Sequence, residues 1–136
     1  MTKRVVLIRA SALIAAVWSS ASLLPSAAAA AAEDKIDFKK QIKPILVKHC
    51  YECHGPHVEK RESDLRLDRK ELAFVDFGGY QNIVPGDPED SELYLRISSD
   101  LDEERMPPAG DGIGLTEEQI ATIRTWIEEG AQWVDD

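Results

Sequence analysis

Apolar residues recur at intervals of three or four in three parts of the chain, which is the pattern of a helix with one buried face. The first part is IDFKKQIKPILVKHC, and the others lie near residues 93–97 and 120–127. The positions that share a face are Phe38, Ile42, Ile45 or Leu46, and Cys50; then Leu93, Tyr94 and Ile97; then Ile120, Ile123, Trp126 and Ile127. No alternating run is long enough for a sheet, so the pattern predicts an all-α fold.

Local signals predict where these helices begin and end. Pro44 removes one backbone hydrogen bond inside the first pattern, so it should kink that helix or divide it into two pieces. Proline also favours the first position of a helix, which predicts that the second helix begins at Pro88. In the third helix, Thr116 and Gln119 have the spacing of a capping box, with Leu115 and Ile120 placed for a hydrophobic staple; Gly130 is a suitable stop.

The segments between the predicted helices are long and mostly polar. They cover residues 55–64, the glycine-rich and proline-rich stretch FGGYQNIVPGDPED, and residues 98–114. Within the first long interval, Leu65 and Leu67 of LRLD alternate with polar residues and should point inward, and a short helical turn should follow at residues 70–74. Long loops in so short a chain indicate a central group around which they wrap.

The first 32 residues have the layout of a secretory signal peptide. A basic front carries Lys3, Arg4 and Arg9, a short apolar run follows at 10–18, and the alanine tract at 27–32 offers several A-x-A cleavage sites. The alternative is an uncleaved membrane anchor, but the uninterrupted apolar run is far shorter than the ~20 residues that span a bilayer. We therefore expect a signal peptide at 1–32 and a single exported, soluble domain at 33–136.

The expected mature chain is strongly acidic. Removing the leader leaves 136 − 32 = 104 residues, with 13 basic and 25 acidic side chains and a net charge of −12. Nucleic-acid binding needs clustered Lys and Arg to contact phosphate, and the sequence pattern shows no basic stripe. The charge therefore argues against a nucleic acid as partner.

The segment CYECH, residues 50–54, contains both cysteines of the chain. A disulfide between Cys50 and Cys53 would close a very small loop, where the entropic gain is least, and would give His54 no role. A redox dithiol needs a strand-and-helix context that is missing here. A zinc site needs four ligands, and the only other histidines, His49 and His57, crowd into the same stretch.

Covalent haem explains all three residues of this segment. On a continuous helix Cys50, Cys53 and His54 lie at i, i+3 and i+4, which is one face. Two thiols there can form thioethers with the two vinyl groups of a porphyrin, and the adjacent imidazole can reach the iron. C-x-x-C-H is a sequence signature of c-type haem attachment. The motif therefore predicts Cys50, Cys53 and His54 as haem-binding residues, with His54 as an iron ligand.

Met106 is the candidate for the other side of the iron. His49 and His57 are too close to His54 in sequence to cross the porphyrin plane, so both should be surface or loop histidines. Met106 lies in the polar segment RMPPAGDG, away from any apolar stripe, and Pro107 and Pro108 restrict the backbone after it. A sixth position that is open or weakly filled is the alternative.

These segments together resemble the planctomycete-type cytochrome c domain, a branch of the class I cytochrome c fold. The resemblance runs from about Phe38 to Trp133. It rests on the Pro-Ile-Leu step before CYECH, on LRLD, on the GG before VPGDPEDSELY, on RMPP and on WIEEGAQW. The resemblance implies a small class I cytochrome c-like fold, with helices and long loops wrapped around one covalently attached haem. It also implies Cys50 and Cys53 as attachment sites, His54 as the proximal iron ligand and Met106 as the distal one.

The family's domain is often the front end of larger proteins, whereas this chain stops three residues after Trp133. The functions of those larger proteins are therefore not carried over. We expect a periplasmic or otherwise exported electron-transfer protein that is not an enzyme, monomeric, with no membrane span after cleavage and with redox proteins as partners. The alternatives are a haem sensor or peroxidase-like enzyme with an open or labile sixth iron site, and an interaction module whose haem only supports the fold.

Overall fold

The computed structural model describes residues 35–110 and 113–135. The predicted signal peptide lies outside the described residues. The described residues belong to one unit, Glu33–Asp136, and they contain helices but no strand; their only ladder contacts are two isolated bridges, Asp76 with Gln81 and Gln81 with Ser91. This agrees with the predicted all-α fold. Within the described ranges, no helix is both long and apolar enough to cross a membrane.

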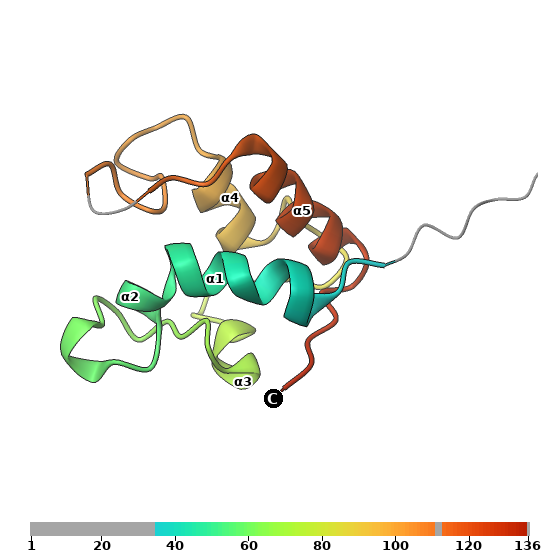
Figure 1. The fold of residues 1–136 in the computed structure, drawn as a ribbon, viewed down its shortest axis with the longest axis horizontal. Helices are drawn as coiled ribbons and strands as arrows, with labels where there is room; N and C mark the ends of the chain where they lie inside the picture. The colour runs from blue at the N-terminus through green and yellow to red at the C-terminus, as the bar shows by residue number, and fades with distance from the viewer. Residues whose placement is uncertain (1–34, 111–112, 136) are drawn as a thin grey trace, which may run out of the picture. The chain divides into compact units, whose positions relative to one another are not determined.

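The first helical segment consists of three consecutive pieces (Figure 1). A π-helical turn, η1, runs over Phe38–Ile42; α1 follows at Lys43–His49, and α2 at Tyr51–His54. Pro44 stands in the first turn of α1, where its missing N–H costs no hydrogen bond. The predicted division of this helix at Pro44 is therefore confirmed.

Two short elements follow before the second long helix. A 3₁₀ turn, η2, spans Val58–Lys60, and α3 spans Lys70–Ala73, close to the helical turn that the sequence predicts. In the LRLD segment Leu67 is buried and Leu65 half-buried, as predicted.

Helix α4 spans Glu92–Ser98, so the prediction that it begins at Pro88 is wrong. Pro88 lies in a separate turn, in which its carbonyl accepts a hydrogen bond from the Ser91 N–H. The first N–H groups of α4 are bound instead by an earlier part of the chain, because Glu92 N donates to Gln81 O at 3.1 Å and Leu93 N to Asn82 O at 2.9 Å. These tertiary bonds satisfy the free donors of the helix end, and they set the start of α4.

Helix α5 spans Glu117–Glu128, and its predicted caps are confirmed. The side chain of Thr116 accepts from Gln119 N, and Gln119 Oε1 accepts from Thr116 N at 2.9 Å, which completes the capping box. At the other end Gly130 has a φ of 96°, Gly130 N donates to Ile127 O, and Ala131 N donates to Trp126 O. This is a Schellman motif, in which glycine adopts the left-handed conformation without strain.

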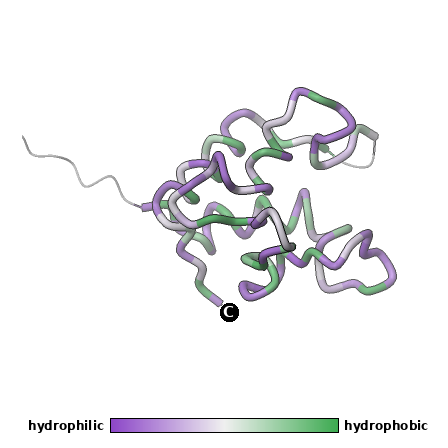
Figure 2. Tube along the Cα trace, turned by 180° about the vertical axis from the view of Figure 1, so that it is seen from behind, coloured by the Kyte–Doolittle hydropathy of each residue, from purple (hydrophilic) through white to green (hydrophobic). Residues whose placement is uncertain are grey.

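The core lies between the first helical segment and the pair α4 and α5. In Figure 2 hydrophobic and hydrophilic residues alternate along the helices, as in elements with one buried face. Trp126 is fully buried, and its ring centroid lies 5.8 Å from that of Phe38. The core residues are Phe38, Ile42, Ile45, Leu46, Leu67, Ala73, Ile83, Leu93, Ile97, Ile123, Trp126, Ile127 and Ala131. The predicted apolar faces are thus buried, with Tyr94 and Ile120 at the edge of the core.

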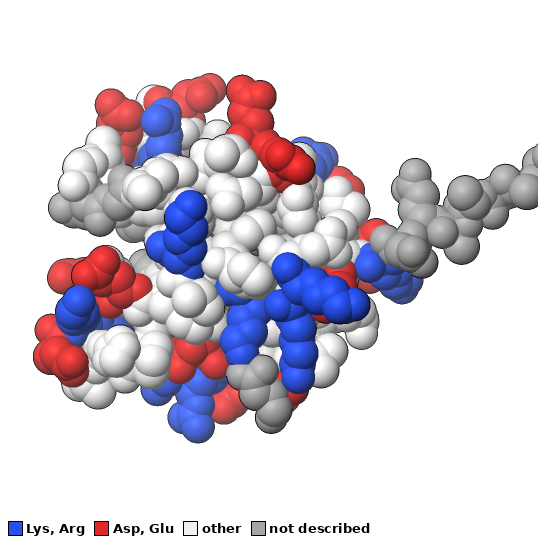
Figure 3. All heavy atoms as spheres, viewed as in Figure 1, with Lys and Arg blue, Asp and Glu red and all other residues white. Residues whose placement is uncertain are grey.

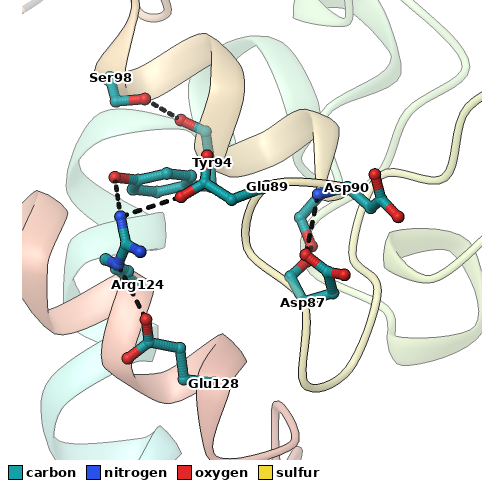
Figure 4. A network of polar contacts seen from close by, with 8 residues as sticks. Asp87, Glu89, Asp90, Tyr94, Ser98, Arg124 and Glu128 are labelled. Carbon is teal, nitrogen blue, oxygen red and sulfur yellow. Dashed lines mark hydrogen bonds and ion pairs between the residues drawn. The ribbon is translucent and has the colours of Figure 1, made fainter.

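A polar network joins α4 to α5 at the surface (Figure 4). Arg124 on α5 donates from Nη1 to Tyr94 Oη at 2.8 Å and from Nε to Glu128 Oε1 at 2.8 Å. The same guanidinium lies 3.0 Å from Glu89 Oε1, in the turn before α4. Arg124 therefore ties together the two helices that cover one side of the core.

Charged side chains are unevenly distributed over the surface. Figure 3 shows Lys and Arg gathered over η1 and α1, and Asp and Glu over the other elements of this face. Residues 35–48 contain five lysines and one acid, Asp37, and all the lysines except Lys43 are exposed. Residues 35–48 are thus a basic segment of an otherwise acidic chain.

Candidate functional site

The CYECH segment is helical but not on one uninterrupted helix. Cys50 separates α1 from α2, with φ −125° and ψ −34°, so the expected continuous helix is corrected at this residue. Helical hydrogen bonds nevertheless continue across it. Cys50 N donates to Leu46 O at 2.9 Å, and His54 N donates to Cys50 O at 2.8 Å. The motif therefore keeps the i, i+3, i+4 relation that places its three side chains on one side.

A cavity of about 840 Å³ lies against this side of the motif. Cys50, Cys53 and His54 line it from the first helical segment, and Met106 lines it from the loop between α4 and α5. Its volume is in the range of ~300–1,000 Å³ that is typical of cofactor pockets. The fold thus brings the four sequence-predicted site residues to one cavity, although Met106 is far from the others along the chain.

A second cavity, of about 390 Å³, adjoins the same residues. His54, Ser63 and Met106 line both cavities. The remaining wall of the second cavity is largely apolar and aromatic, with Leu65, Leu67, Phe77, Tyr80 and Leu93, and Arg96 is its only basic side chain apart from the histidine. The rings of Phe77 and Tyr80 are stacked with centroids 5.4 Å apart, and both side chains are exposed. An apolar, planar group can therefore contact this wall while His54 and Met106 approach it.

His54 has the protonation state and the environment of a metal ligand. Burial lowers the pKa of His54, although the Leu65 backbone and the Glu62 carboxylate oppose this effect. The neutral imidazole, which is the form that binds metals, is thereby favoured. Ser63 Oγ lies 3.3 Å from His54 Nδ1, so that Nε2 is the nitrogen available to a metal. A hydrogen bond at the second nitrogen is the usual way in which a ligating histidine is oriented.

Neither cysteine of the motif is in a disulfide, and both are partly buried. Burial raises the pKa of the Cys50 thiol to about 12, and the neighbouring Cys53 acts in the same direction. Cys50 is therefore protonated at neutral pH. Reduced cysteines that face a cavity are what thioether formation requires.

Met106 lies in the loop between α4 and α5, at a point where this loop folds back onto α4. Its N–H donates to Arg96 O at 3.0 Å, and the residue is 37% exposed. Arg96 Nη1 also donates to Glu104 O at 3.3 Å, and Arg105 Nε donates to Ser99 O at 2.7 Å. Sequence reasoning did not single out Arg96. The spacing of Glu92 and Arg96 indicates an i, i+4 ion pair, but no local signal shows the contacts of Arg96 with Glu104 O and Met106 N, which lie eight and ten residues further along.

The two other histidines have different environments. His57 is exposed and lies in the loop after α2, as expected. His49 departs from the expectation of a surface or loop residue, because it is the last residue of α1, is half-buried and lines the larger cavity. Its Nδ1 lies 2.6 Å from Ile113 O, and its Nε2 lies 3.4 Å from Gln119 Nε2. His49 thus connects α1 to the end of the Met106 loop and to the capping box of α5.

The residues present fit a covalently bound haem. Two cysteine sulfurs, an imidazole held in its neutral form and a thioether sulfur line the same space, and an apolar wall adjoins it. Two thiols would attach a c-type haem to the chain, and one imidazole and one methionine thioether would be its iron ligands.

The comparison with known families agrees with this chemistry. The family model described as planctomycete cytochrome C matches residues 50–110. The match begins at the first cysteine of CYECH and ends four residues after Met106, so it covers a shorter stretch than the resemblance from Phe38 to Trp133. No curated protein and no solved structure matches the chain. The recognition made from the sequence is confirmed over the matched segment: residues 50–110 of this chain match the planctomycete cytochrome C family.

Proposed function

We propose that this protein is an exported mono-haem c-type cytochrome that acts as a one-electron carrier. The family match gives a cytochrome c domain, which agrees with haem binding and electron transfer. The observation that carries the finer proposal is that Cys50, Cys53, His54 and Met106 line one cavity of about 840 Å³. Two attachment sites and two iron ligands are what a single haem needs, and the sequence has no further cysteine to which a second haem could be attached.

Each of the four side chains has one role in this proposal. Cys50 and Cys53 hold the haem through thioether bonds, so that it cannot dissociate. His54 binds the iron on the proximal side through Nε2, since Ser63 occupies Nδ1. Met106 binds it on the distal side, and a His/Met pair raises the reduction potential relative to two histidines. The haem itself supplies a one-electron couple, and the protein keeps the sixth position filled so that small molecules do not react there.

The proposed export rests on the sequence of the first 32 residues and on the chemistry of attachment. Thioether formation requires reduced cysteines in an exported apoprotein, and a signal peptide at 1–32 would deliver the domain 33–136 to that compartment. We propose a soluble monomer in the periplasm or an equivalent compartment.

Redox proteins with a basic docking patch are the proposed partners. Asp102, Glu103 and Glu104 are exposed and directly precede Arg105 and Met106. Met106 itself is 37% exposed. An acidic group in the Met106 loop therefore places negative charge near the route by which an electron would leave. Complementary charge on a partner steers such an encounter and raises its rate.

One observation favours a second candidate function. The exposed Met106 side chain lies on a loop rather than on a long helix, and a thioether that dissociates from the iron would open the sixth position. The protein would then be a haem sensor or a peroxidase-like enzyme. Binding of carbon monoxide by the reduced, unmodified protein separates the two functions, because an electron carrier with a stable Met ligand excludes it.

The proposal is tested on protein matured in a periplasm with a c-type haem assembly system. The haem should stay on the chain through denaturation and acidic organic extraction, and replacing both Cys50 and Cys53 with Ala should abolish this. Oxidised and reduced absorption spectra should be low-spin and interconvert reversibly with a small redox protein. Haem that extracts freely from the unmodified chain contradicts the c-type assignment, and a high-spin spectrum contradicts the carrier assignment.

A further inference from the structure

The loop that carries Met106 is tied back to the last turn of α4 by three hydrogen bonds. Met106 N donates to Arg96 O at 3.0 Å, Arg96 Nη1 donates to Glu104 O at 3.3 Å, and Arg105 Nε donates to Ser99 O at 2.7 Å. Two of the three involve Arg96, once through its carbonyl and once through its guanidinium. Arg96 therefore binds residues 104–106 at two points, the N–H of Met106 and the carbonyl of Glu104.

The side chain of Arg96 is itself held in one direction. Its Nε donates to Glu92 Oε1 at 2.7 Å, one helical turn earlier, and the Glu92 side chain is only 25% exposed. The backbone N–H of Glu92 is bound in turn to Gln81 O at 3.1 Å. The planar guanidinium can thus direct one nitrogen to Glu92 and another to Glu104 O. Lysine, with a single ammonium group, cannot reproduce this fork.

Arg96 also lies at the site. Arg96, Glu92, His54 and Met106 all line the cavity of about 390 Å³. By contrast Arg124, which makes three comparable contacts with Tyr94, Glu89 and Glu128, lines neither this cavity nor the larger one. The two arginines are paired to a similar extent, but only Arg96 reaches the Met106 loop.

We propose that Arg96 is the positioning residue for Met106: it holds the loop so that the thioether stays directed into the cavity that it shares with His54. This inference rests on the proposed function, in which Met106 is the distal iron ligand. Arg96 does not touch the iron in this proposal. It restricts the conformations of residues 104–106, so that less entropy is lost when the sulfur binds and the methionine leaves the iron less often.

The test uses the mature haem protein in four forms: unmodified, Arg96→Lys, Glu92→Gln and Arg124→Lys. Arg96→Lys keeps the charge but removes the guanidinium that binds Glu92 and Glu104 O together. Glu92→Gln weakens the contact that orients Arg96 while leaving the arginine in place. Arg124→Lys is the matched control. Carbon monoxide affinity of the reduced protein measures how often Met106 leaves the iron. Amide hydrogen exchange at Met106 measures how firmly the loop is held, whatever the sulfur binds.

Losing one net hydrogen bond should shift two equilibria, carbon monoxide binding and the opening of the Met106 amide, by about 3- to 10-fold each. We expect Arg96→Lys to bind carbon monoxide about 3- to 10-fold more tightly, to exchange the Met106 amide faster by a similar factor and to have a lower midpoint potential. Glu92→Gln should show smaller changes in the same directions. Arg124→Lys should lower the free energy of unfolding while leaving carbon monoxide affinity and Met106 exchange unchanged.

The outcomes separate the two proposals. Unchanged Met106 exchange in Arg96→Lys overturns the role of Arg96, and so does an equal gain in carbon monoxide affinity in Arg124→Lys, since the effect would then come from general destabilisation. Faster exchange in Arg96→Lys, combined with tight carbon monoxide binding already in the unmodified protein, shows that Arg96 holds the loop but that Met106 is not the distal ligand. That result contradicts the proposed function and not the anchoring of the loop.

Discussion

Replacing Trp126 with alanine tests whether the core between η1 and α5 holds the domain together. Trp126 is fully buried, its ring centroid lies 5.8 Å from that of Phe38, and its Nε1 donates to Gln132 O at 3.0 Å. Removing a buried tryptophan side chain costs about 3–5 kcal/mol, since the cavity left behind relaxes only partly. We therefore expect Trp126→Ala to lower the free energy of unfolding by about 3–5 kcal/mol.

That loss is a large part of the free energy of unfolding of a domain of this size, which is only ~5–15 kcal/mol. Guanidinium unfolding of the mature haem protein, followed by far-UV circular dichroism, measures it. Trp126→Phe, which keeps a ring but loses the bond to Gln132, should cost less than the alanine variant. Trp133→Ala is the comparison at a half-buried tryptophan. A loss below about 1 kcal/mol for Trp126→Ala would refute the reasoning, since it would mean that the stripe of α5 is not a buried contact.

Three further predictions concern single side chains. Met106→Ala should keep the covalent haem, convert the iron to a high-spin or water-ligated form, lower the potential and admit carbon monoxide, as absorption spectra and redox titration would show; a spectrum like that of the unmodified protein would exclude Met106 as ligand. Burial alone would raise the pKa of Asp68, but hydrogen bonds from Arg66 outweigh it and the pKa is lowered. The folded state therefore favours the carboxylate, and unfolding in acid takes up a proton. The free energy of unfolding should fall as the pH drops below the ordinary pKa range of Asp, and Asp68→Asn should flatten this dependence in a pH series of unfolding curves. His49→Asn keeps a donor near the position of Nδ1 and should preserve the link to Ile113 O, whereas His49→Leu should speed amide exchange near residue 113; equal exchange in both variants would argue against that link.

The features that sequence reasoning predicted correctly are those whose causes lie within a few residues. Thr116 and Gln119 cap each other across three positions, and Gly130 ends the same helix through bonds to the turn before it. The effect of Pro44 is equally local, since a proline lacks its own N–H. CYECH contains two cysteines and a histidine within five residues, so spacing alone was enough to indicate haem.

The features that sequence reasoning missed depend on contacts between segments that are distant along the chain. The start of α4 follows from the carbonyls of Gln81 and Asn82, which satisfy the first N–H groups of the helix, so the local preference of Pro88 was overridden. His49 was assigned to the surface because nothing near it in sequence shows that Ile113 O and Gln119 lie beside its ring.

The acidic group beside the Met106 loop leads to a prediction about the encounter with a redox partner. Glu103 and Glu104 are exposed, and so are Glu71 and Asp90, which line neither of the two cavities at the site. Exposed charges interact over about 30 Å at ~0.01 M salt but only over about 8 Å at ~0.15 M salt, so steering should act on the association rate and fade as salt rises.

We therefore expect stopped-flow electron exchange with a basic redox protein to slow as salt increases, and the variant Glu103→Gln with Glu104→Gln to show a weaker dependence. The variant Glu71→Gln with Asp90→Asn removes the same net charge elsewhere on the surface. If only the total charge matters, the two double variants will change the salt dependence equally; if the distal loop is the docking surface, the first will change it more. A rate that stays flat or climbs with salt in the unmodified protein would assign the acidity to solubility and not to docking.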